Sequence, residues 1–152
     1  MVDVGTKPES RREAVAVGEI RVSSDVMRLL KTGRVSKGDV FAVSRIAGIL
    51  AAKKVPELIP LCHPLKLDEV RVSFRLNRDR IFVRAEVKSE GKTGVEMEAL
   101  TAVSVASLTI YDMCKSADKG MTLGPIHLAG KSGGRSGTYV RPGGQRRSVR
   151  WL

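Results

Sequence analysis

The stretch VEMEALTAVSVASLTIYDMCKSADK (95–119) contains neither Pro nor Gly. Apolar and small side chains recur in it every three or four residues, which is the spacing of one face of an α-helix. An unbroken segment of this length predicts a long helix, and the other elements must pack around it. The residues on its predicted face are Leu100, Val103, Ser107, Ile110 and Cys114.

Two alternating segments precede this helix. In residues 68–76 (DEVRVSFRL) and 80–89 (RIFVRAEVKS), apolar side chains alternate with Arg, Glu and Lys, and Asn77, Arg78 and Asp79 join the two. This pattern predicts a β-hairpin with one face exposed to water.

Three further elements lie upstream. Residues 14–22 (AVAVGEIRV) are typical of a strand, and 25–31 (DVMRLLK) of a short helix that stops at Gly33. Residues 39–54 predict an amphipathic helix that ends before Pro56 and Pro60. Its predicted apolar face consists of Val40, Phe41, Ile46, Ile49 and Leu50.

The proline-bounded segment 55–65 (VPELIPLCHPL) predicts a rigid, extended connection. Helices alternating with paired strands predict an α+β fold, with two helices packed on one face of an antiparallel sheet. The other face must then be polar or covered by a second subunit.

Composition fits one domain. The chain has 152 residues, 42% of them hydrophobic, which is enough to bury a core. We expect a single catalytic domain over residues 1–137 and a basic, flexible tail over 138–152. The N-terminal sequence is polar and does not resemble a signal peptide, and long apolar runs are missing, so we expect a cytoplasmic protein with no membrane span. Both cysteines are expected to be free thiols.

The net charge of +11 favours polyanionic partners, and six of these charges lie from residue 131 onward. The charge raises a nucleic-acid-binding module as an alternative to an enzyme. Two features disfavour a nucleic-acid-binding module: aromatic residues for base stacking are scarce, and the positive charge is concentrated in the tail. A non-catalytic assembly subunit with the same fold is a third reading.

Four segments are candidates for chemistry, and the first holds Cys62 and His63 between prolines. Adjacent side chains of an extended chain point to opposite faces, which disfavours a Cys–His dyad or a shared metal. A chain with two Cys and two His also offers little for a structural zinc site. A structural role and a ligand-binding role for His63 both remain open.

The second segment, GKTGVEME (91–98), invites comparison with a phosphate-binding P-loop. That motif requires Gly where the chain has Glu86, so the P-loop reading fails. Glu96 and Glu98 at the start of the long helix are ordinarily complements to its dipole.

The third candidate pairs Asp112 with Lys115 on the long helix, which is the spacing of a surface ion pair. Glu98 lies on nearly the same helix face as Asp112 but about 20 Å away along the axis. One small ligand cannot touch both within a single chain. The fourth candidate, KSGGRSG (131–137), is either an anion-binding turn or a flexible hinge.

Three of these segments, taken in order, strongly resemble one family. IPLCHP (59–64), KTGVEMEALTAVSVASLTIYDMCK (92–115) and GPIHLAGKSGG (124–134) are similar to the cyclic pyranopterin monophosphate synthase family of molybdenum cofactor biosynthesis, and the similarity extends from about Val2 to Gly137. The resemblance implies a ferredoxin-like fold and a homohexamer built as a trimer of dimers, with active sites between subunits.

The resemblance also implies a reaction. Members rearrange (8S)-3′,8-cyclo-7,8-dihydroguanosine 5′-triphosphate to cyclic pyranopterin monophosphate and release diphosphate. The family motifs place the acid/base residue on Asp112 and its cationic partner on Lys115, whose pKa we expect neighbouring cations to lower. Mg²⁺ bound through the triphosphate is compatible with the sequence, which shows no dedicated metal cage. The residues implied to bind substrate are Leu61, Cys62, His63, Met97 and Glu98 and, on shorter motifs, Lys37, Arg12, Glu96 and Lys131.

Overall fold

The computed structural model describes residues 1–142 and 151–152 of the chain. Its helices and strands, in chain order, are β1 (Ser10–Arg21), α1 (Ser24–Thr32), α2 (Val40–Lys53), α3 (Val55–Leu58), β2 (Glu69–Asn77), β3 (Arg80–Gly91), α4 (Glu96–Cys114), β4 (Thr122–Ser132) and β5 (Tyr139–Val140).

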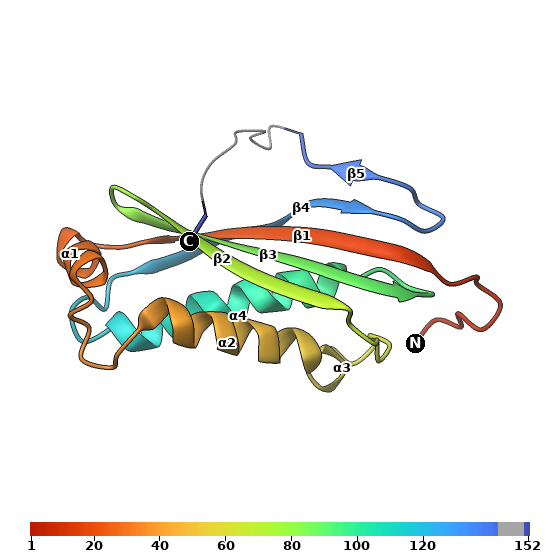
Figure 1. Ribbon diagram of the computed structural model, residues 1–152, viewed down its shortest axis with the longest axis horizontal. Coiled ribbons are helices and arrows are strands. Elements are labelled where there is room, and N and C mark those ends of the chain that lie inside the picture. The colour runs from red at the N-terminus through yellow and green to blue at the C-terminus, as the bar shows by residue number, and fades with distance from the viewer. Residues whose placement is uncertain (143–150) are drawn as a thin grey trace.

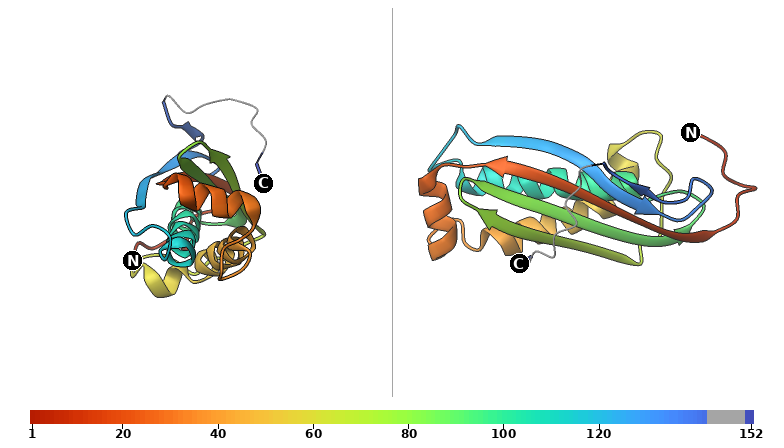
Figure 2. Two further views of the ribbon diagram at one scale, coloured as in Figure 1. Left: turned by 90° about the vertical axis from the view of Figure 1, so that its left-hand side faces the viewer. Right: turned by 90° about the horizontal axis from the view of Figure 1, so that it is seen from above.

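The strands form one antiparallel sheet in the order β2-β3-β1-β4-β5. Helices α2 and α4 run side by side beneath one face of this sheet, and the opposite face carries no helix in the described part of the chain (Figure 1). Seen from above, the strands lie across the full length of both helices (Figure 2). The predicted α+β, ferredoxin-like arrangement is therefore confirmed.

The core lies between the sheet and α4. Along β3, Ile81, Val83, Ala85 and Val87 are fully buried, whereas the residues between them point to the other face. This period of two explains why the hairpin β2–β3 is amphipathic and why its register is fixed. The predicted hairpin and its turn at residues 77–79 are confirmed.

Helix α1 begins and ends as the sequence predicts. The Ser23 side chain accepts a hydrogen bond from the Val26 N–H, which satisfies one of the free amides of the first turn. Gly33 ends the helix with φ of 64°, a left-handed conformation in which glycine carries no steric penalty.

The predicted apolar face of residues 39–54 is partly wrong. Ile46 and Leu50 are 60% and 52% exposed, although Val40 is buried as expected. The buried face of α2 instead runs through Ser44 and Gly48, and these small residues allow α2 to approach α4 closely. The larger side chains are left on the outside of the helix pair.

The predicted extended connection is also partly wrong, because residues 55–58 form the short helix α3. Pro56 lies in the first turn of α3, where proline is accepted because its missing N–H would have no partner in the helix. The chain is irregular from there to β2. Cys62 and Cys114 are free, and Cys114 is buried.

The region predicted as a flexible tail contributes β5, which pairs with β4 through Tyr139 and Val140. Trp151 and Leu152 lie against β2, and residues 143–150 of that predicted tail lie outside the described residues. In the described part of the chain, each helix is too short or too polar to cross a membrane.

The close contact of α2 with α4 predicts that a larger residue at Gly48 lowers the free energy of unfolding. A Cβ at Gly48 would lie 2.9 Å from the backbone oxygen of Ala102, which cannot rotate away as a side chain can. We expect Gly48→Ala to lower the free energy of unfolding by about 1–2 kcal/mol in urea denaturation, despite the helix propensity of alanine. Gly91→Ala is the control, because its Cβ would meet only Ser89 Oγ at 3.7 Å. A more stable Gly48→Ala variant would contradict tight packing.

Candidate functional site

The last turn of α4 holds a carboxylate between two ammonium groups. Asp112 Oδ2 lies 2.6 Å from Lys37 Nζ, and Oδ1 lies 2.7 Å from Lys115 Nζ. Lys37 also donates to the Asp112 backbone oxygen at 3.0 Å. This lysine comes from the loop between α1 and α2, so the tertiary fold brings it to a helix end that sequence spacing does not connect with it.

Charge pairing shifts the protonation of this cluster. Hydrogen bonds from Lys115 and then Lys37 lower the pKa of Asp112 to about 2. The same contact with Asp112 raises the pKa of Lys115, so the expectation that neighbouring cations lower it is wrong. The nearest charge to Lys115 is the Asp112 carboxylate, and an opposite charge favours the charged form.

The other end of α4 carries a second ion pair. Lys131 Nζ on β4 lies 2.8 Å from Glu96 Oε1 and 2.9 Å from Ser136 Oγ. Arg12 on β1 donates to the backbone oxygens of Gly91 and Lys92, each at 3.2 Å, and these bonds hold its guanidinium beside the same loop.

These groups surround a cavity of about 880 Å³ between the start of β1, the loop before α4 and the turn after β4. Gly133 and Gly134 line this cavity, and both have positive φ. A Cβ at Gly134 would overlap the Arg12 guanidinium, which is why this turn requires glycine. The cavity adds two cations, Lys7 and Lys92, that the sequence motifs do not place in the site. It also includes Arg135 of the predicted anion-binding turn.

Glu98 lies in the first turn of α4 and is buried, with 3% of its surface exposed. Burial raises the pKa of this carboxyl, and the charge of Glu96 raises it further. Burial and then the charge of Glu98 raise the pKa of Cys62, so these two residues are neighbours. Met97 and His63 are half-buried, and Leu61 is 70% exposed.

The charged candidate residues therefore fall into two groups at opposite ends of α4. We call Lys37, Asp112 and Lys115 the lysine–aspartate cluster, and the residues around the cavity and Glu98 the cavity cluster. Glu98 and Asp112 are separated by about 20 Å of helix. The described residues include no group of three or more His, Cys, Asp or Glu side chains placed to hold a metal ion.

An α+β fold with two separated clusters of cations and carboxylates defines a protein suited to a small, polyanionic ligand. The sequence profile of the MoaC family matches residues 1–134, and the chain belongs to this family.

Three relatives are named cyclic pyranopterin monophosphate synthase. The one from Pelotomaculum thermopropionicum is 55% identical and aligns over 94% of this chain and 85% of its own length. The protein from Roseiflexus sp. (strain RS-1) is 58% identical and aligns over 92% of this chain and 90% of its own length. The protein from Thermomicrobium roseum is 52% identical and aligns over 99% of this chain and 92% of its own length.

The lysine–aspartate cluster predicts an unusual titration. The Asp112 carboxyl is expected to titrate at a pKa of about 2, as measured by carbon NMR of the side chain. Because folding lowers this pKa, the pair stabilises the fold above the ordinary aspartate pKa, and the contribution is lost as pH falls through the folded value. Lys37→Met should raise the pH midpoint of the Asp112 titration, whereas Lys53→Met, a change at an exposed lysine outside the cluster, should leave this midpoint unchanged. An unchanged midpoint in Lys37→Met would contradict the pairing.

Proposed function

We propose that this chain is a cyclic pyranopterin monophosphate synthase. It would convert (8S)-3′,8-cyclo-7,8-dihydroguanosine 5′-triphosphate to cyclic pyranopterin monophosphate and diphosphate. The names of its relatives support this activity, since all three are called synthases and none is called a nucleic-acid-binding protein. The observation that carries the proposal is the presence of both charged clusters, each built from the residues that the family motifs imply.

The complete site is composite in this proposal. One nucleotide cannot span the length of α4, so the lysine–aspartate cluster of one subunit must face the cavity cluster of another. An exposed apolar stripe on the helix layer supports such contact: Val43, Ile46 and Leu50 of α2 are 44%, 60% and 52% exposed, and Leu108 of α4 is 55% exposed. A twofold axis through this layer would set the two α4 helices antiparallel. We propose the homohexamer of three such dimers.

The cations would act on the phosphates. Closing a cyclic phosphate on the ribose-derived part displaces diphosphate, and negative charge builds up on the leaving oxygens. Lys131 and Arg12 in the cavity, with Lys37 from the facing subunit, would stabilise this charge. A divalent metal ion would enter bound to the triphosphate, since its hard oxygen ligands are supplied there.

The two carboxyl groups are suited to different tasks. Asp112, with a pKa of about 2, stays ionised at neutral pH and holds two ammonium groups in position. Lys115, which this contact keeps protonated, then offers a hydrogen bond that Asp112 orients. Glu98, whose pKa is raised by burial, is the carboxyl better prepared to exchange a proton with the ring during opening and reclosure. Leu61, Cys62, His63 and Met97 would contact the base.

We propose that residues 1–137 form the catalytic domain. We also propose a cytoplasmic location, because the cytoplasm supplies nucleoside triphosphates and keeps thiols reduced.

The direct test supplies purified protein with the cyclised dihydro-GTP and follows diphosphate and pterin product. Both are expected to form in equal amounts, and Asp112→Asn should lose nearly all turnover while keeping its fold and oligomer size. If the unaltered protein forms neither diphosphate nor the pterin product, the proposed activity is wrong. Near-normal turnover by Asp112→Asn would remove this residue from the mechanism.

A mixing experiment tests the composite site. Asp112→Asn and His63→Ala subunits, each inactive alone, are unfolded together and refolded. A mixed dimer has one site with both changes and one site with neither, so random pairing should restore roughly a quarter of the unaltered turnover. The control mixes Asp112→Asn with Lys37→Ala, which belong to the same cluster and should not complement. Equal recovery in both mixtures, or in neither, would argue against sites shared between subunits.

A further inference from the structure

The outer edge of the sheet is strand β2, which has β3 on one side only. An edge strand presents unpaired N–H and C=O groups that can pair with another chain. In β2 these outward groups belong to every second residue, and Val72 and Phe74 lie at the middle of the strand.

Three of these outward groups, at Val72 and Phe74, are paired with other residues of the chain. The Leu152 N–H donates to the Phe74 carbonyl oxygen at 2.8 Å, and the Phe74 N–H donates to the Leu152 oxygen at 3.5 Å. Arg45 on α2 donates from Nε to the Val72 oxygen at 3.0 Å and from Nη2 to the Leu152 oxygen at 3.2 Å. A reciprocal backbone pair of this kind is how an added strand binds a sheet edge.

The neighbouring Trp151 lies on the helix-free face, close to two arginines. Its ring is 5.4 Å from Cζ of Arg75 and 5.9 Å from Cζ of Arg84. Arg75 Cζ also lies 4.4 Å from the Phe82 ring, so two aromatic rings lie near this guanidinium. Cation–π attraction of this type strengthens when the cation is shielded from water.

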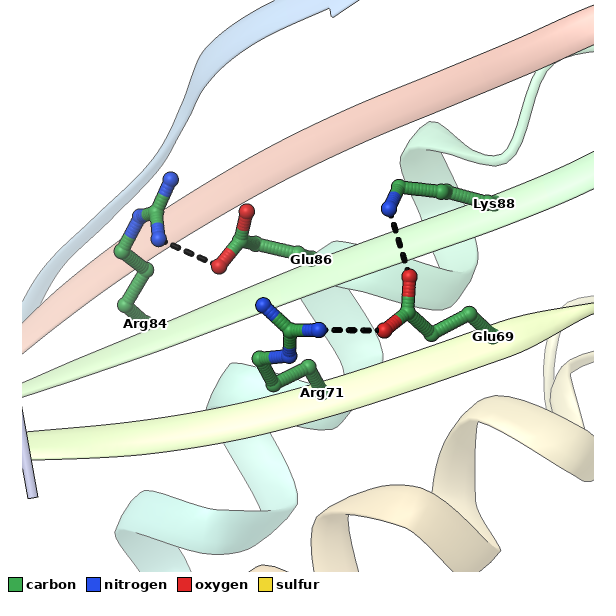
Figure 3. Close-up of polar contacts among 5 residues, drawn as sticks. All are labelled: Glu69, Arg71, Arg84, Glu86 and Lys88. Atoms are coloured by element: carbon green, nitrogen blue, oxygen red, sulfur yellow. Dashed lines mark hydrogen bonds and ion pairs between the residues drawn. The ribbon is translucent and has the colours of Figure 1, made fainter.

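Arg75 differs from Arg71, Arg84 and Lys88, the neighbouring cations of this face. Arg71 and Lys88 both pair with Glu69 at 2.6 Å, and Arg84 pairs with Glu86, as Figure 3 shows. Within the described residues Arg75 has no carboxylate partner, and its Nε is buried without an acceptor. The aromatic rings are therefore the groups that compensate its burial.

We propose that Trp151–Leu152 is a built-in edge ligand, called here the clasp. Leu152 extends the sheet at Phe74, Trp151 covers Arg75, and together they close the edge of β2 to pairing with other chains. Strand β5 lies on the opposite edge of the sheet, so described residues of the C-terminal region are found at both edges.

Trp151 is the only tryptophan of the sequence, so its fluorescence reports the clasp alone. In the folded protein we expect blue-shifted emission and poor quenching by acrylamide relative to the urea-unfolded chain. Arg75→Met should lower the ratio of docked to free clasp roughly two- to five-fold, the equivalent of about 0.5–1 kcal/mol. Arg71→Met is the matched control, because Arg71 pairs with Glu69 and not with the ring, and it should leave quenching unchanged.

Amide exchange supplies a second readout that does not need the fluorophore. In a chain lacking residues 151 and 152, the outward Phe74 amide should exchange several-fold faster, and the Arg75 amide, which faces β3, should not change. The shortened chain should also scatter more light on storage, since its sheet edge is open. A Trp151 as accessible in the folded protein as in urea, or an unchanged Phe74 amide, would overturn the proposal.

Discussion

The close contact of α2 with α4 is the constraint on which the rest of the molecule depends. Gly48 leaves room for α2 to lie against the backbone of α4 at Ala102, and small residues continue this seam along both helices. Because the seam uses small side chains, Ile46 and Leu50 are left on the outer surface. The packing that closes the core thereby also creates the apolar surface available to a second subunit.

The length of α4 sets the layout of the site. Its first turn presents Glu96 and Glu98 beside β1 and β4, and its last turn presents Asp112 beside the loop that carries Lys37. The environments of the two ends are opposite in effect. Two ammonium groups lower the pKa of the exposed Asp112, whereas burial raises the pKa of Glu98. One helix thus carries Asp112, which stays ionised, and Glu98, which is more readily protonated, at positions too far apart to influence each other strongly.

The two faces of the sheet are used differently. The inner face is apolar and covered by helices, and the outer face holds charged residues that pair along and across β2 and β3 (Figure 3). Such pairs contribute little stability each, but they leave few unpaired charges on the face. Arg75 has no carboxylate partner among the described residues, and aromatic contacts take the place of one there.

The sequence by itself determined most of the elements and their order. The alternation in residues 68–89, the stop of α1 at Gly33 and the unbroken helical segment up to Cys114 are local signals, because hydrogen bonding and side-chain direction repeat with fixed periods. Its motifs also named most of the residues of both clusters. Only the tertiary structure decided which face of α2 is buried, that Lys37 and not only Lys115 pairs with Asp112, and that Trp151 lies on β2. These contacts join residues far apart in the chain, and their formation depends on the packing distance between elements, which no local period encodes.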